Sequence, residues 1–166
     1  SDGLDVKEDF HSHLVLKSPA MVNRCLKAIL PIFEHHGRRC IFRTWTVGAH
    51  EVGDLIWHEA TLEKTIAGIT NPALVLSMKY GESDFFRYLS LNRNFFVTAL
   101  PKIVELQTRR EYEGCGEYPS FVGGDYEQIA IELRDAPNVV GISVWCQTGG
   151  WTPFRRLAFI EPAAIW

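Results

Sequence analysis

Residues 73–80 read ALVLSMKY, an almost continuous apolar run that ends in a lysine and a tyrosine. Such a run is typical of a strand in a parallel sheet, because both of its faces are covered by other layers. Three further segments have the β-branched and aromatic content of strands, namely RCIFRTWTV, KIVELQ and NVVGISVWC. Helical patterns between them favour right-handed crossovers. The sequence therefore predicts an α/β fold built from parallel β/α units.

Helix signals separate these strands. Residues 18–37 predict a first helix, with a proline in the first turn, where it is tolerated, and a glycine at the end. Asp54 is expected to cap a second helix over residues 55–69, and residues 126–134 predict a short third one. The stretch FFRYLSLNRNFFVTALP predicts a long irregular or short-helical connection between two strands.

The number of strands limits the architecture. Four strands cannot close a barrel, and a (β/α)₈ barrel usually needs about 250 residues. Two interpretations follow: a small open α/β sheet, or part of a TIM (β/α)₈ barrel whose other half lies elsewhere. We favour the second. Residues 1–166 are then expected to form a single catalytic-type α/β domain that is a fragment of a larger barrel.

Composition excludes several classes of partner. The formal net charge of -3 and the pI near 6.1 argue against nucleic acid and anionic membranes. No apolar run is long enough to span a bilayer, and the first ten residues lack the pattern of a signal peptide. The four cysteines show no CxxC spacing and are interpreted as mostly buried thiols. The choice between cytoplasm and periplasm stays open, and a homo-oligomer is compatible with these features.

Charged residues stand at or just past the expected carboxyl ends of the strands: Arg43, Lys79, Asp84 and Glu105. Ligands and chemistry gather at this edge in parallel α/β proteins. A buried polar residue costs free energy unless it is paired, so the series requires an explanation. One explanation is a site for an anionic substrate. The other is a structural ion-pair network in which Arg43 or Lys79 is held by Glu105.

Aromatic residues accompany the charged series. Trp45 and Trp145 are expected at strand ends and Tyr112 in the loop after the third strand. Flat rings of this kind stack on sugar faces, although ordinary packing explains them as well.

The residues around these positions resemble a known family. KYGESDFFRYLS followed by KIVELQTRREYEG, with RTWTV before them, is similar to the catalytic core of the α-glucuronidases of glycoside hydrolase family 67. The resemblance covers most of the chain, from the opening SDG to about Tyr118, and is most specific around Lys79, Asp84 and Glu105.

The resemblance implies an eight-stranded barrel of which this chain forms the later half. Asp84 and Glu105 match the carboxylates that activate the attacking water of an inverting mechanism. Arg43 and Lys79 match cations that hold the uronic carboxylate of the substrate. The family's general acid lies in a Ser-Glu-Gly-like segment, and the corresponding residue here is Asp2.

The chemistry of glycoside cleavage fits these residue types. An inverting enzyme needs an acid for the leaving oxygen and a carboxylate about 6.5–9.5 Å away that activates water. Arginine recognises a carboxylate in a bidentate manner and lysine adds a point charge. We therefore predict an inverting glycosidase that releases a terminal acidic sugar from an oligosaccharide and needs no cofactor or metal.

Two alternatives stay open. His11 and His13 form a His-x-His pair of the kind that binds a divalent metal, as in amidohydrolase-like enzymes. A non-catalytic carbohydrate-binding barrel domain would use the same aromatic and charged residues without hydrolysis.

Overall fold

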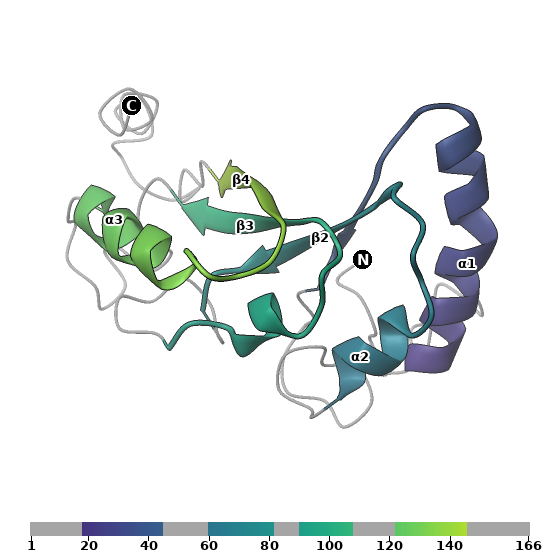
Figure 1. Ribbon diagram of the computed structural model, residues 1–166, viewed down its shortest axis with the longest axis horizontal. Helices are drawn as coiled ribbons and strands as arrows, with labels where there is room; N and C mark the ends of the chain where they lie inside the picture. Colours follow the sequence, from purple (N-terminus) through teal and green to yellow (C-terminus); the bar gives the residue numbers. More distant parts are fainter. Residues whose placement is uncertain (1–17, 45–59, 82–89, 108–121, 146–166) are drawn as a thin grey trace, which may run out of the picture.

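The computed structural model describes residues 18–44, 60–81, 90–107 and 122–145 (Figure 1). They contain a four-stranded sheet in the order β1-β2-β3-β4, and every neighbouring pair is parallel. The strands are β1 (Cys40–Arg43), β2 (Leu74–Lys79), β3 (Lys102–Gln107) and β4 (Val139–Trp145). The predicted α/β fold with a parallel sheet is confirmed.

The helices alternate with the strands along the chain. They are α1 (Pro19–His35), α2 (Thr61–Ile66), the 3₁₀ helix η1 (Arg93–Phe96) and α3 (Gly123–Glu132). The Ser18 hydroxyl accepts a hydrogen bond from the Met21 N–H at 3.3 Å and so caps α1, as the Ser-Pro signal predicts. The connection between β2 and β3 contains η1, in agreement with the short-helical expectation.

The carboxyl end of α2 lies three residues before the end of the expected helix over residues 55–69. It stops at Ile66, because Gly68 adopts a positive φ of 64° that is incompatible with a continuing helix. At the other end, Ala60 is in the left-handed conformation directly before Thr61. The expected cap, Asp54, lies outside the described residues.

One face of the sheet forms the hydrophobic core with the helices. Side chains alternate along each strand, and this core face carries Leu74, Leu76 and Met78 of β2 together with Val104 and Leu106 of β3. The same cluster contains buried residues from every described helix: Val22, Leu26, Leu30, Leu62, Ile66, Phe95 and Ile129. The described helices therefore cover this core face.

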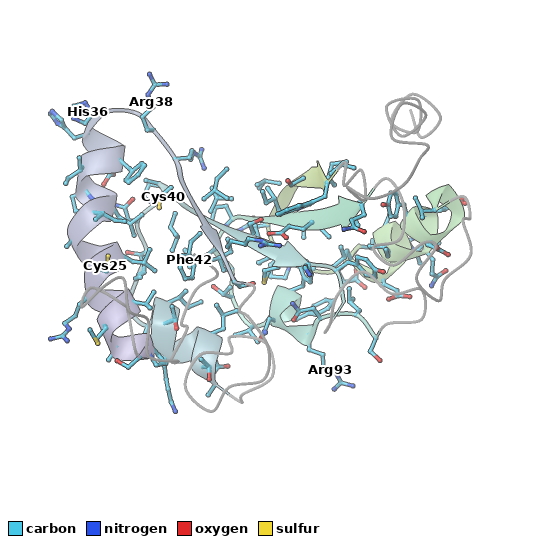
Figure 2. All side chains as sticks on the ribbon, turned by 180° about the vertical axis from the view of Figure 1, so that it is seen from behind. Cys25, His36, Arg38, Cys40, Phe42 and Arg93 are labelled. Atoms are coloured by element: carbon cyan, nitrogen blue, oxygen red, sulfur yellow. The ribbon has the colours of Figure 1, made fainter. Side chains whose placement is uncertain are left out.

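Helices α1 and α2 pack side by side at one end of the molecule, and α3 lies at the opposite end (Figure 1). The amide of Asn23 on α1 donates hydrogen bonds to the carbonyls of Thr65 at 2.8 Å and Ala67 at 3.0 Å. These two carbonyls belong to the last turn of α2, so α1 satisfies groups that the helix itself leaves without donors. Figure 2 shows Cys40 and Phe42 of β1 between α1 and the rest of the sheet.

The opposite face of the sheet changes character along the strand direction, and we call it the polar face. Ile41, Val75 and Ile103 lie near the amino ends of their strands. Toward the carboxyl ends the same face carries polar and charged residues, namely Arg43, Ser77, Lys79, Glu105, Gln107, Ser143 and Trp145. Several of these polar residues are buried, so the fold keeps a polar cluster at the carboxyl edge of the sheet.

The cysteines are less buried than expected. Cys25 and Cys40 are free thiols and only half-buried, whereas Cys115 and Cys146 lie outside the described residues. Burial raises the pKa of the Cys40 thiol, and the nearby Cys25 raises it further. In the part of the chain that the structure describes, no helix has the length and apolar character to cross a bilayer.

A buried lysine ties two connections together at the amino edge of the sheet. Lys102 is 0% exposed, and its Nζ donates to the carbonyls of Thr98 at 2.6 Å and Pro137 at 2.5 Å. Burial lowers the pKa of Lys102 to about 8 from its ordinary value of 10.5. The folded state therefore releases this proton at lower pH than the unfolded chain.

Replacing Lys102 with Met should change how stability depends on pH. Between about pH 8 and pH 10.5 the unfolded wild-type chain holds more protons at this position than the folded one, so wild-type stability rises with pH. The free energy of unfolding of the wild type relative to K102M should rise by about 2 kcal/mol between pH 7.5 and pH 10. Urea unfolding across this range measures the difference. K64M, at an exposed lysine of α2, is the control, and the same pH dependence in both variants would contradict the prediction.

Candidate functional site

An ion pair crosses the polar face of the sheet. Arg43, the last residue of β1, donates its Nε–H to both carboxylate oxygens of Glu105 on β3, at 3.0 Å each. The Glu105 side chain is 1% exposed and that of Arg43 is 30% exposed. A carboxylate this deeply buried needs a charged partner and hydrogen bonds, and Arg43 supplies the charge from two strands away.

A serine on the intervening strand completes the pairing. Ser77 on β2 lies directly beside Arg43 in register, and its Oγ donates to Glu105 Oε1 at 2.6 Å. Its backbone carbonyl accepts bonds from the Thr44 N–H at 2.9 Å and the Thr44 hydroxyl at 3.3 Å. Three adjacent strands therefore hold a single carboxylate.

An aromatic ring covers the guanidinium. Arg43 Cζ lies 4.4 Å from the ring centroid of Trp145, the last residue of β4. Such a contact is a cation–π interaction, which stabilises the arginine and fixes its plane. Trp145 is also predicted as a platform for a sugar ring, and the structure shows that one part of its surface contacts Arg43.

Two further polar side chains share the face. Lys79, the last residue of β2, is 3% exposed, and its backbone lies in register with that of Glu105. Gln107 ends β3 and is also 3% exposed, in register with Trp145. The structure thus brings together four of the predicted site residues, namely Arg43, Lys79, Glu105 and Trp145.

The backbone on either side of residues 82–89 is anchored at the carboxyl end of β2. Gly81 and Leu91 form an antiparallel bridge, and the Asn92 N–H donates to the Tyr80 carbonyl at 2.8 Å. The buried Asn92 amide also donates to the Lys79 carbonyl at 3.3 Å.

The remaining predicted residues cannot be placed. Asp2, Trp45, Asp84 and Tyr112, together with the histidine pair at 11 and 13, lie outside the described residues. Within the described ranges, no group of three His, Cys, Asp or Glu side chains is arranged to hold a metal ion.

Sequence reasoning missed Ser77 as a member of the site. A signal was available, because Ser77 is the only hydroxyl in the otherwise apolar run before Lys79 and shares the face of Lys79 by alternation. The ion pair itself was foreseen as the structural alternative to a substrate site. Its presence is common to both interpretations and does not choose between them.

Comparisons of the chain with protein-family models, with curated proteins and with solved structures found no match.

The contact between Arg43 and Glu105 should give a large coupling energy. Glu105→Gln and Arg43→Gln each remove one charge of the pair, so the double variant should be more stable than the sum of the single changes predicts. We expect a coupling energy of about 2 kcal/mol in a double-mutant cycle measured by urea unfolding. Arg43→Gln combined with Ser143→Ala is the control cycle, because Ser143 lies in register with Glu105 from the other side. Equal coupling in both cycles would contradict the assigned contact.

Proposed function

We propose that this chain belongs to an inverting glycoside hydrolase of the α-glucuronidase type, which releases a terminal acidic sugar from an oligosaccharide. The observation that supports it best is the cluster at the carboxyl edge of the sheet. There a buried carboxylate, Glu105, is held by Arg43 and Ser77 beside Lys79 and the ring of Trp145. These residue types suit a sugar that carries a carboxylate.

The sheet topology supports the larger barrel that this proposal includes. Strands in the sequential order β1-β2-β3-β4 with right-handed crossovers place all connections on one face. In doubly wound sheets the order reverses and helices cover both faces. Here the described helices cover the core face, and the polar face is left for an interior such as that of a TIM barrel.

The contact between Arg43 and Trp145 also favours a curved sheet. Their strands are the two outer ones, and in a flat sheet three strand spacings would separate the backbones by about 14 Å. The side chains meet across β2 and β3 on the polar face. A face that is concave in this direction makes such a contact easy, as the inner face of a barrel does.

We assign the roles as follows. Glu105, together with Asp84, is the general base that takes a proton from the attacking water. Asp2 is the general acid that protonates the leaving oxygen. The water oxygen then bonds to the anomeric carbon as the glycosidic bond breaks, which inverts the configuration.

Binding groups complete the proposed site. Arg43 and Lys79 hold the sugar carboxylate, and Trp145 supplies apolar surface beside the guanidinium. Trp45 and Tyr112 are proposed as further contacts with the sugar. No cofactor takes part in this proposal.

The deep burial of the ion pair favours a second candidate, a carbohydrate-binding domain that does not hydrolyse its ligand. In that case Glu105 would serve only to fix Arg43 for sugar recognition. No described residue favours the third candidate, a metal-dependent hydrolase that uses His11 and His13.

Replacing Glu105 with Gln separates hydrolysis from binding. The amide cannot accept the proton of the attacking water, so kcat in the full-length protein should fall about 10²- to 10⁴-fold. Release of uronic acid from an oligosaccharide with a terminal α-linked glucuronic acid measures the rate. Glu127→Gln, the same change on the exposed surface of α3, is the control. Unchanged turnover in the Glu105 variant would exclude its role as a base, and sugar binding without any wild-type hydrolysis would favour the second candidate.

A further inference from the structure

We infer that Ser77 is a positioning residue that fixes the orientation of the Glu105 carboxylate, so that Oε2 is the oxygen that accepts the proton of the water. This inference rests on the proposed function, because it assigns the reacting atom of the proposed base.

The two oxygens of Glu105 are not equivalent. Oε1 accepts from the Ser77 hydroxyl at 2.6 Å and from Arg43 Nε at 3.0 Å. Among the described residues, Oε2 accepts one hydrogen bond, from the Nε–H that it shares with Oε1, at 3.0 Å. A carboxylate offers about two acceptor positions on each oxygen. The acceptor capacity of Oε1 is therefore taken up within the protein, and that of Oε2 is left for a further donor.

Arg43 alone could not produce this difference. Its single Nε–H lies at equal distances from the two oxygens, so a half-turn of the carboxylate would leave that interaction unchanged. The bond from Ser77 removes the equivalence, and charge-assisted O–H···O⁻ bonds of this length are strong. The serine makes a rotation of the carboxylate costly.

The serine is itself held in place. Ser77 is 5% exposed in the middle of β2, and its carbonyl carries two hydrogen bonds from Thr44. Both neighbouring strands are paired with β2 around it. The hydroxyl is thus presented to Glu105 from a rigid element, which is what a group that orients a reacting atom requires.

A matched serine allows a sharp comparison. Ser143 on β4 lies in register with Glu105 on the side opposite β2, and among the described residues its hydroxyl makes no hydrogen bond to Glu105. Serine-to-alanine changes at 77 and 143 remove the same atom from the two strands that flank β3. Only the change at 77 removes a bond to the carboxylate.

The test compares Ser77→Ala, Ser77→Thr and Ser143→Ala in the full-length protein, with thermal unfolding to verify folding. In Ser77→Ala, kcat should fall about 10- to 100-fold because the base is misoriented, while KM changes less than about twofold because the binding groups are kept. Ser77→Thr keeps the hydroxyl and should restore most of kcat. Ser143→Ala should behave as the wild type.

A spectroscopic measurement separates this inference from the proposed function. The NMR signal of the Arg43 Nε–H should exchange faster with water in Ser77→Ala than in the wild type or in Ser143→Ala. Faster exchange together with the loss of kcat supports the inference. A Ser77→Ala variant with wild-type kcat overturns the inference and leaves the proposed function standing. A wild-type protein that hydrolyses no uronic-acid glycoside overturns the proposed function, and with it the assignment of Oε2.

Discussion

The burial of one carboxylate governs the arrangement of the polar face. Glu105 has almost no contact with solvent, and an isolated charge there would be very costly. Arg43 of β1 and Ser77 of β2 offset this cost by hydrogen bonds to the carboxylate, and the ring of Trp145 of β4 contacts the arginine. The interacting side chains therefore come from all four strands of the sheet.

The two faces of the sheet carry different kinds of residue. Apolar residues of β2 and β3 pack with the helices on the core face. At the amino edge of the sheet, Lys102 donates hydrogen bonds to the carbonyls of Thr98 and Pro137. The polar face keeps its charged residues at the carboxyl edge, where parallel sheets bind ligands. Strand alternation produces this division, since consecutive residues such as Met78 and Lys79 point to opposite faces.

The sequence predicted much of the fold because its strands are strongly patterned. KIVELQ corresponds to the full length of β3, and the alternation of Ser77 with Lys79 placed both on one face as observed. The predicted end of α2 was wrong, because the helix stops before Gly68, whose positive φ cannot be recognised from hydrophobic periodicity. The sequence places Ser77 on the same face as Lys79, but it does not show that the Ser77 hydroxyl reaches Glu105 or that Trp145 reaches Arg43, because these contacts depend on how far side chains extend across strands. The sequence pointed to the charged residues and left their pairing open.

The central claim is that the carboxyl edge of this sheet recognises a sugar acid. Titration of the protein with glucuronate and with glucose, followed through the indole N–H signal of Trp145 and the Nε–H signal of Arg43, tests it most directly. The account predicts saturable shifts of both signals with glucuronate, weak or absent shifts with glucose, and loss of the response in Lys79→Met. Signals that stay unmoved by glucuronate, or that move equally with glucose, would contradict it.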